Sequence, residues 1–471
     1  MILVVGLGVT GEAVAARLAP DGPVTVVDDN PSAPSFGPRA EALTARGVRV
    51  VGAPTADELA DLVAAADLVV PSPGVPEAHP VYGLAGRAGV PLRSEIELAG
   101  AAAARRGVPL VAVTGTNGKT TVTTLIAAML GAGGRRAVAA GNIGRPLLDA
   151  VHDDVDVVVA EVSSFQLRFT ETFRPRVAVF LNVAEDHLDW HPSFKEYVAA
   201  KARIFANQSG DDLLVFNADD DAVAGVAATA PARSVAFTLR ADGAPGTGSG
   251  CASGASGGHA AWRLENGHLR RPDGAPLLAA AELARAGPHD VANALAAAAA
   301  AADLGIGDDA LRSVLGSFAG LPHRVAPVGQ SGGVTFVDDS KATNPHAALA
   351  ALAGFDSVVL LAGGRNKGLD LGVLRGEAGR IRAVVAIGEA ADEVAACFDG
   401  LRPVRRAGSM AAAVRLGAEL AEPGDTVLLS PACASFDWYS GYAARGDDFA
   451  REVRALLETG LLESRFMESG S

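Results

Sequence analysis

A glycine-rich segment, GTNGKT at 115–120, has the residue types that bind and use nucleotide phosphates. It follows the apolar run 110–113 and opens a stretch that is patterned as a helix to about residue 130. In such a turn, backbone N–H groups and the positive helix end face an anion, Lys119 offsets charge on the β- and γ-phosphates, and Thr120 reaches Mg²⁺. The spacing GxxGKT is shorter than the GxxxxGK[ST] of the general P-loop, and an ordinary glycine turn before a helix is the alternative.

Three further polar residues could take part in that chemistry. Glu161 ends the apolar run VDVVVAE, where a carboxylate could bind magnesium; a helix-capping acid is the structural alternative. His187 follows the run VAVFLN, and Lys201 lies fourteen residues later in a predicted helix. A single histidine after a strand is more often packed or hydrogen-bonded than a ligand, so His187 decides little by itself.

A second glycine turn, GLGVTG at 6–11, matches the GxGxxG pattern of dinucleotide-binding folds. Asp28 ends the next strand at about the separation expected for an acid that binds a ribose. Taken alone, the pattern predicts an NAD-dependent oxidoreductase. The same glycines equally serve close helix packing or another diphosphate ligand, and an oxidoreductase leaves GTNGKT unexplained.

Polar loops follow three apolar runs near the C-terminus: DDSKATN at 338–344, GGRNK at 363–367 and SPACASFDWY at 430–439. Because open α/β sheets bind ligands at the carboxyl ends of their strands, we expect the three loops to face one crevice. The alternatives are structural: Asp339 caps a helix, Lys367 is a surface charge, and Ser435 stabilises its own loop.

Short β-branched runs alternate with helical stretches along the whole chain, which predicts parallel α/β units. The pattern restarts near residue 100 and again near 320. We therefore expect three domains, at 1–100, 101–319 and 320–471. The Gly/Ser-rich stretch 241–258 and the tail after Glu463 are predicted to be mobile and to carry no chemistry.

Composition excludes several classes of protein. The chain of 471 residues has a formal charge of −14, the wrong sign for a protein whose main partner is nucleic acid. Its three cysteines, Cys251, Cys397 and Cys433, have no paired spacing, which indicates a reducing compartment and argues against a zinc site. With no long apolar run, and with Met1–Gly6 patterned as a strand, we expect a cytoplasmic protein with no membrane insertion and no secretory signal.

Taken together, the motifs TGTNGKTT, AGNIG, EVSSFQL, NVAEDHLD, GLPHR, DDSKATNP and SPACASFD resemble those of the Mur ligase family across nearly the full length. The resemblance implies an α/β protein of three-domain architecture: a Rossmann-like N-terminal domain, a P-loop-type central ATPase domain and a Rossmann-like C-terminal domain. It implies an ATP-dependent ligase, and it is greatest to the members that add D-glutamate to UDP-N-acetylmuramoyl-L-alanine in peptidoglycan precursor synthesis.

The resemblance also implies the ligands and their contacts. It makes the first glycine turn a site for UDP rather than NAD, and it implies two Mg²⁺ ions, a carbamylated Lys201 and action as a monomer. The UDP-substrate residues would be Val9, Thr10, Asp28, Asn142 and His187. The ATP residues would be Gly115, Thr116, Asn117, Gly118, Lys119, Thr120, Thr121, Asn293, Arg324, Asp339 and Lys341. One magnesium would bind Thr120 and Glu161, the other His187 and Lys201, and D-glutamate would bind Thr343, Lys367, Ser435, Phe436 and Tyr442.

The lysine count agrees with this assignment, since four of the five lysines belong to the implied site and only Lys195 does not. By the resemblance, Lys119, His187 and Lys201 are the catalytic residues, the acyl phosphate of the L-alanyl carboxylate is the intermediate, and a hinge lies near residue 320. The rival hypothesis within the class is another amino-acid-adding ligase, such as a later Mur enzyme or a folylpolyglutamate synthetase-like enzyme. The rival from other classes is the oxidoreductase or a non-catalytic nucleotide sensor.

Overall fold

A computed structural model describes residues 1–187, 190–240 and 261–459. These residues form two compact units, which are considered separately. The first unit contains 1–183, 190–284 and 291–318; the second contains 184–189, 285–290 and 319–471. The predicted mobile segments at 241–258 and after Glu463, and Cys251, lie outside the described residues.

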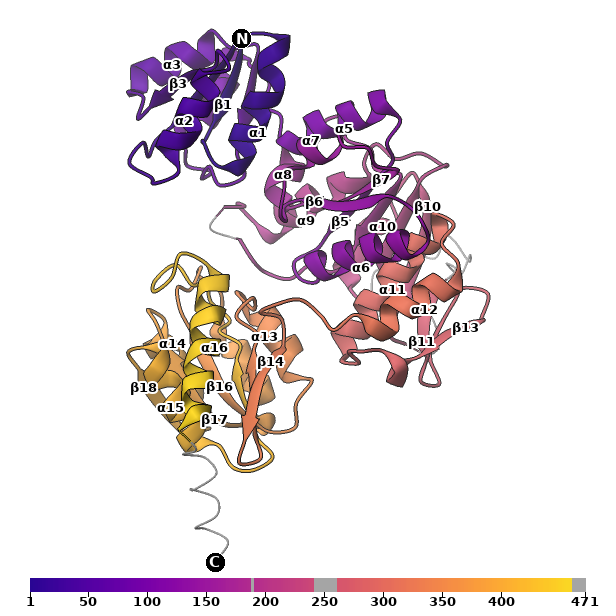
Figure 1. The fold of residues 1–471 in the computed structure, drawn as a ribbon, viewed down its shortest axis with the longest axis vertical. Helices are drawn as coiled ribbons and strands as arrows, with labels where there is room; N and C mark the ends of the chain where they lie inside the picture. Colours follow the sequence, from indigo (N-terminus) through magenta and orange to yellow (C-terminus); the bar gives the residue numbers. More distant parts are fainter. Residues whose placement is uncertain (188–189, 241–260, 460–471) are drawn as a thin grey trace, which may run out of the picture. The chain divides into compact units, whose positions relative to one another are not determined.

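The first unit begins with a four-stranded parallel sheet of order β3-β2-β1-β4 (Figure 1). Successive side chains of a strand point to opposite faces, and here both faces are covered: Val4 packs into one core and Leu3 into another. That double burial explains the continuous apolar runs in the sequence. The elements are β1(Ile2–Val5), α1(Val9–Leu18), β2(Val24–Asp28), α2(Phe36–Thr44), β3(Arg49–Gly52), α3(Ala56–Ala64), β4(Leu68–Pro71) and α4(Pro80–Ala88).

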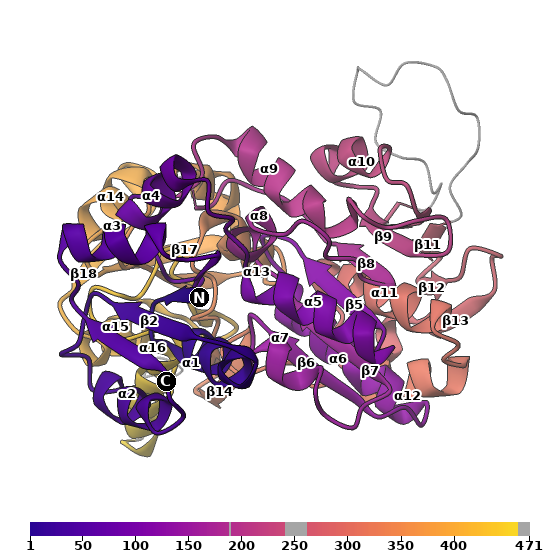
Figure 2. The same ribbon diagram turned by 90° about the horizontal axis from the view of Figure 1, so that it is seen from above.

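A nine-stranded sheet of order β13-β12-β11-β10-β9-β8-β5-β7-β6 forms the rest of this unit. Its strands are parallel except for the antiparallel pairs β11–β12 and β12–β13, which lie at the outer edge (Figure 2). The strands are β5(Leu110–Thr114), β6(Ala137–Gly141), β7(Val157–Glu161), β8(Val177–Phe180), β9(Leu213–Asn217), β10(Arg233–Thr238), β11(Ala261–Glu265), β12(His268–Arg270) and β13(Pro276–Ala279).

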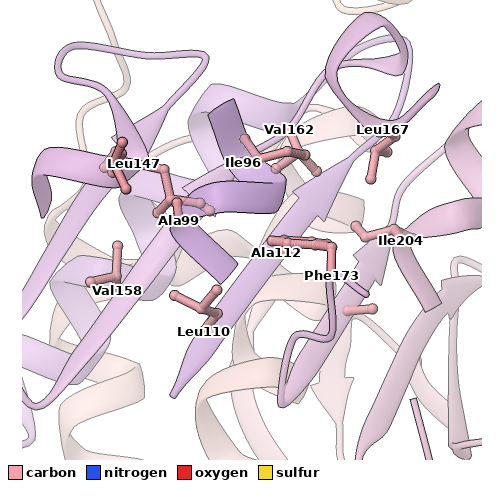
Figure 3. Close-up of a cluster of buried hydrophobic side chains, with 14 of the residues drawn as sticks. Ile96, Ala99, Leu110, Ala112, Leu147, Val158, Val162, Leu167, Phe173 and Ile204 are labelled. Atoms are coloured by element: carbon pink, nitrogen blue, oxygen red, sulfur yellow. The ribbon is translucent and has the colours of Figure 1, made fainter. Parts of the chain in front are cut away.

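Helices cover both faces of the nine-stranded sheet (Figure 1). One face meets α5, α7 and α9 through the core of Figure 3, where Ile96 and Ala99 of α5 pack over Leu110 and Ala112 of β5. The other face meets α6, α11 and α12. The helices are α5(Glu95–Arg106), α6(Lys119–Ala132), α7(Leu147–Ala150), α8(Ser164–Arg168), α9(Phe194–Ala202), α10(Asp221–Ala227), α11(Pro288–Asp303) and α12(Asp308–Ser317).

The second unit is built on a six-stranded sheet of order β14-β15-β19-β16-β17-β18, parallel except for the pair β14–β15. Helices α13 and α14 pack on one face, and α15 and α16 on the other. The elements are β14(Ala326–Ser331), β15(Val334–Asp338), α13(Pro345–Leu352), β16(Val358–Gly363), β17(Ile381–Ile387), α14(Ala391–Phe398), β18(Val404–Ala407), α15(Met410–Leu420), β19(Thr426–Leu429) and α16(Tyr442–Glu458).

The predicted α/β class and three-part architecture are confirmed, with one sheet in each predicted domain. The boundaries near 100 and 320 stay predictions, because contacts divide the chain into two units and α5 runs across residue 100. No helix among the described residues is both long and apolar enough to cross a membrane.

Candidate active site

The segment GTNGKT forms the turn between β5 and α6, as predicted. β5 ends at Thr114, and α6 begins at Lys119, directly after Gly118. Gly118 has φ +84°, in the left-handed region that glycine adopts without strain, and this turns the chain into the helix. The loop therefore leads into the N-terminal end of α6, the end of a helix that favours an anion.

The Lys119 side chain folds back over the turn. Its Nζ donates hydrogen bonds to the carbonyl oxygens of Gly115 and Thr116, each 2.8 Å away. This holds a compact positive charge on the loop, where it can meet a phosphate.

Two asparagines from distant parts of the chain support the same loop. The Asn182 Oδ1 accepts the Asn117 N–H at 2.9 Å, and the Asn182 carbonyl accepts the Thr116 N–H at 3.0 Å. Asn293 of α11 lies so close that a Cβ added at Gly118 would be 2.6 Å from its Oδ1. The structure thus brings the predicted Asn293 to the phosphate loop and adds Asn182, which the sequence analysis did not select.

Glu161 lies at the end of β7, the strand next to β5. It is 3% exposed; its Oε1 accepts a 2.9 Å hydrogen bond from Asn142 Nδ2, while its Oε2 is buried with no hydrogen-bond partner among the described residues. A buried carboxylate oxygen without a partner fits a hard cation such as Mg²⁺. The helix-capping alternative is wrong, because Ser163 caps α8.

The described residues contain no group of three or more His, Cys, Asp or Glu side chains that could hold a metal.

Lys201 is a buried lysine on α9. It is 2% exposed, its Nζ donates to the Gly115 carbonyl at 2.8 Å, and it lies 4.6 Å from the centre of the Tyr197 ring. The Tyr197 hydroxyl lies 3.1 Å from the Thr116 Oγ1. Lys201 therefore reaches the same loop as Lys119, whereas His187, its predicted partner on a metal, belongs to the second unit, so that pairing stays a prediction.

Asp186 is the centre of a polar cluster in the second unit. It pairs with Lys367 Nζ, accepts a 2.9 Å hydrogen bond from Asn344 Nδ2, and accepts the His187 backbone N–H at 2.8 Å. Burial alone would raise the pKa of Asp186, but the His187 and Lys367 charges hold it below its usual value. Lys367 is 16% exposed, so its surface-charge alternative is wrong.

The three predicted polar loops of this unit are tied to one another. Arg445 of α16, 2% exposed, donates to the carbonyl oxygens of Ser340 at 2.8 Å and Cys433 at 3.1 Å. Backbone hydrogen bonds of 2.8 and 3.0 Å join Arg365 to Ala434. The three loops are thus joined at the carboxyl ends of the neighbouring strands β15, β19 and β16, and the crevice that they were expected to face stays a prediction.

Asp339 is a buried acid at the end of β15. Its Oδ2 accepts the Ser430 hydroxyl at 2.8 Å, and its Oδ1 accepts the Val325 N–H at 3.2 Å. Burial raises the pKa of Asp339 to about 7, although these hydrogen bonds and Arg324 oppose the shift. The helix-capping alternative is wrong here too, since Asn344 caps α13.

The residues predicted for D-glutamate have different environments. Thr343 donates its backbone N–H to the Lys341 carbonyl at 2.8 Å, and the Lys341 Nζ lies 3.7 Å from the centre of the Tyr442 ring. Ser435 is 2% exposed and its carbonyl accepts the Tyr439 N–H at 2.9 Å, so its loop-stabilising alternative stays open. Phe436 is 62% exposed and so contributes little to the core of the unit.

A pocket of about 480 Å³ opens in the first unit at the carboxyl ends of β1 and β4. We call it the β1–β4 pocket. It lies where the sheet order reverses, the usual ligand position in open α/β sheets. Four of the five residues predicted for the UDP-substrate line it, and His187 does not: the lining includes Val9, Thr10, Asp28, Asn142, Ser72, Pro76, His79 and Gln166.

The β1–β4 pocket shows what sequence reasoning missed. Its wall includes Ser72–Pro76, which follow β4 with the sequence SPGVP, and the helix residue Gln166 of the EVSSFQL motif. The polar turn after β4 is the sequence feature from which these pocket residues could have been predicted. Asp28 is already bonded there, accepting the Leu7 N–H at 2.6 Å and the Asn30 N–H at 2.8 Å.

Comparison with known proteins gives three matches to family models. The MurD-like N-terminal domain of Mur ligases matches 1–94, the Mur ligase middle domain matches 113–301, and the Mur ligase glutamate ligase domain matches 323–433.

Full-length relatives agree with these matches. The UDP-N-acetylmuramoylalanine–D-glutamate ligase of Frankia casuarinae is 44% identical and aligns over 96% of this chain and 94% of its own length. The ligase of the same name from Desulfosudis oleivorans is 42% identical over 97% and 96%. Among solved structures, the UDP-N-acetylmuramate–alanine ligase MurC of Thermotoga maritima is 19% identical with a TM-score of 0.56, covering 96% of this chain and 99% of that one, which shows a shared fold. The chain belongs to the Mur ligase family.

Proposed function

We propose that this enzyme joins D-glutamate to UDP-N-acetylmuramoyl-L-alanine, using ATP and releasing ADP and phosphate. The observation that carries the proposal is the 44% identity to a D-glutamate ligase over nearly the whole chain. The phosphate loop agrees with it, because Lys119 lies over that loop and Glu161 offers a free buried oxygen beside it.

The first step activates a carboxylate. The L-alanyl carboxylate oxygen attacks the γ-phosphorus of ATP. The bond between this phosphorus and the β–γ bridging oxygen breaks, ADP departs, and the carboxylate becomes an acyl phosphate. Lys119 and the N–H groups of the loop at Gly115–Thr121 offset charge on the phosphoryl oxygens, since phosphoryl transfer depends on positioning and electrostatics. Asn293, Arg324, Asp339 and Lys341 complete the ATP contacts.

Glu161 and Thr120 would hold one Mg²⁺, and His187 and a carbamylated Lys201 the other. Bound magnesium supplies positive charge to the phosphate oxygens. Carbamylation joins the neutral Lys201 amine to CO₂ and releases one proton, which leaves a carboxylate on the side chain. Lys201 is 2% exposed, and its Nζ reaches the same Gly115 carbonyl as the Lys119 Nζ, which places it at the phosphate loop.

The second step forms the amide. The D-glutamate amine attacks the acyl carbon, the carbon–oxygen bond to phosphate breaks, and the amine gives up its proton. Thr343, Lys367, Ser435, Phe436 and Tyr442 would position D-glutamate, and His187 is the candidate to accept the proton. The UDP moiety would occupy the β1–β4 pocket against Val9, Thr10, Asp28 and Asn142. We place the enzyme in the cytoplasm, acting as a monomer on small molecules.

A phosphate-release assay tests this function. UDP-N-acetylmuramoyl-L-alanine, ATP and D-glutamate are each omitted in turn, and meso-diaminopimelate, L-alanine and L-glutamate replace D-glutamate in parallel. We expect release only with all three proposed substrates, and a loss of activity of about a hundredfold to a thousandfold in Lys119→Ala. The exposed Lys195→Ala is the matched control.

Release with another amino acid would identify a different amino-acid-adding ligase. Protection against proteolysis by NADH but not by UDP would favour the oxidoreductase. Full activity of Lys119→Ala would contradict the proposed mechanism.

A further inference from the structure

A small chamber adjoins the β1–β4 pocket, within the first unit. Its walls include Ser94 and Glu95 at the start of α5, Phe165 and Gln166 of α8, and Trp190. Gln166 also lines the β1–β4 pocket, so the two cavities share a wall. The open volume of the chamber, about 10 Å³, is close to the space that one water molecule needs.

Three residues of this wall each have a buried polar atom with no hydrogen-bond partner among the described residues. These atoms are the Ser94 Oγ, the Glu95 Oε2 and the Trp190 Nε1. A buried polar group without a partner costs about 1–3 kcal/mol, so three around one chamber indicate a molecule that bonds to them. The set is complementary: the indole N–H only donates, the carboxylate oxygen accepts, and the hydroxyl can do either.

The other oxygen of Glu95 faces a different element. Glu95 Oε1 accepts the backbone N–H of Leu148 in the first turn of α7. The segment directly before α7, residues 141–146, supplies Asn142 and four other residues to the wall of the β1–β4 pocket. Glu95 therefore holds the helix that follows this pocket loop, while its second oxygen is buried with no hydrogen-bond partner among the described residues.

Among the titratable groups around the chamber, Glu95 is the one whose charge changes near pH 7. Burial raises the pKa of Glu95 to about 7, assisted by Asp149 on α7 and opposed by the α7 backbone N–H groups. Burial raises the pKa of Tyr82 on α4 to about 12 and lowers the pKa of His191 to about 4.

The other charged groups nearby are paired with each other or with backbone groups. On α8, Arg168 lies 4.9 Å from the centre of the Trp190 ring and pairs with Glu77. On α5, Glu97 accepts backbone N–H groups of 171–173.

We propose that this chamber binds one small neutral molecule, water, which joins the Glu95 carboxyl to the Trp190 indole, and that Glu95 thereby positions the loop 141–146 of the substrate pocket. The first part depends only on the chamber and the buried polar atoms of its residues, and not on the proposed function. The second part rests on the proposed function, because it assigns the β1–β4 pocket to the UDP-substrate.

NMR of the full chain with ¹⁵N-labelled tryptophan indoles tests the first part. Trp190→Phe identifies the Trp190 resonance among the three tryptophans of the chain. We expect that resonance to shift with a midpoint near pH 7, and to stop shifting in Glu95→Gln but not in the exposed control Glu58→Gln. A Trp190 resonance that does not titrate, or that titrates equally in Glu95→Gln, would overturn the proposal.

Steady-state kinetics tests the second part. Glu95→Ala should raise the KM for UDP-N-acetylmuramoyl-L-alanine about tenfold, the effect of losing one charge-assisted hydrogen bond, with little change in kcat or in the KM for ATP. Glu95→Gln keeps an acceptor for the Leu148 N–H and should restore the KM to within about twofold.

Equal effects of the two substitutions, or an equal rise in the KM for ATP, would refute the positioning role. If the proposed function itself is wrong, the unmodified enzyme shows no turnover while the indole titration persists.

Discussion

At the scale of single residues, the two lysines of the phosphate loop share one acceptor. Lys119 Nζ and Lys201 Nζ each lie 2.8 Å from the carbonyl oxygen of Gly115. Two ammonium groups this close repel one another. A carbamate on Lys201 would replace one positive charge by a negative one and so turn repulsion into attraction.

The modification can be tested with Lys201→Arg, which keeps a cation but removes the amine that reacts with CO₂. We expect a loss of activity of about a hundredfold or more, as for other changes at a metal site. The assay is phosphate release with and without added bicarbonate, and Lys195→Arg on the exposed face of α9 is the control. Unchanged activity of Lys201→Arg would exclude a carbamylated lysine.

Asp339 predicts a specific pH dependence of stability. Its pKa is raised to about 7 by burial, so the protonated folded form contributes stability that is complete below about pH 4 and is lost as the pH rises toward 7. Between pH 5 and pH 8, the free energy of unfolding measured with urea should fall by about 3 kcal/mol more in the wild type than in Asp339→Asn. The exposed Asp309→Asn should behave as wild type. A parallel pH profile for Asp339→Asn would show that this carboxyl has an ordinary pKa.

Sequence reasoning found the residues with distinctive chemistry and missed those that hold them. Lys119, Glu161 and Asp339 each follow an apolar strand within a recognisable motif, so their position could be predicted. Asn182 and Arg445 could not, because their role depends on backbone carbonyl and N–H groups that come near only in the folded chain.

At the scale of elements, α11 shows how an alanine-rich helix can form part of a core. Its eight residues from Ala294 to Ala301 are all buried against the nine-stranded sheet. Small side chains let this helix lie close to its neighbours, and the same helix carries Asn293 to the phosphate loop. The packing of α11 therefore sets the position of a predicted ATP contact.

Enlarging an alanine of this helix should destabilise the first unit. In Ala297→Leu the added atoms enter a fully buried position, and overpacking of this kind costs about 1–3 kcal/mol. Urea unfolding measures the loss, and Ala104→Leu on the exposed face of α5 should change stability by less than about 0.5 kcal/mol. Equal stability of the two variants would show that the α11 packing has spare room.

Strands were predictable where both faces are buried and hard to predict at edges. β5, β7, β16 and β19 are continuous apolar runs, because helices cover both faces of their sheets. β14 and β18, with the sequences APVGQS and VRRA, lie at the two edges of the third sheet and carry no such run. Pairing with one neighbour fixes them, and pairing is not visible in local pattern.

At the scale of the whole molecule, the predicted contacts are divided between the two units. The phosphate loop belongs to the first, while Arg324, Lys341 and the predicted D-glutamate residues belong to the second. The chain passes from the first unit to the second for the last time at 318–319, close to the hinge predicted near residue 320.

Ligand binding should therefore make the molecule more compact. In many enzymes that bring several substrates together, domains close around the ligands, and a few loop residues act as the hinge. Small-angle scattering with a non-hydrolysable ATP analogue and both other substrates should give a smaller radius of gyration than ATP analogue alone. An unchanged radius would exclude closure of the units.

The exposure of the five lysines has a practical consequence. Lys195 is exposed on α9, whereas Lys119, Lys201, Lys341 and Lys367 are partly or fully buried. At mildly alkaline pH, an amine-directed dye or biotin ester should attach to this side chain ahead of the other four. The enzyme thus offers a nearly unique handle for immobilisation or for a fluorescent reporter, placed outside the chemistry that the remaining lysines are expected to perform.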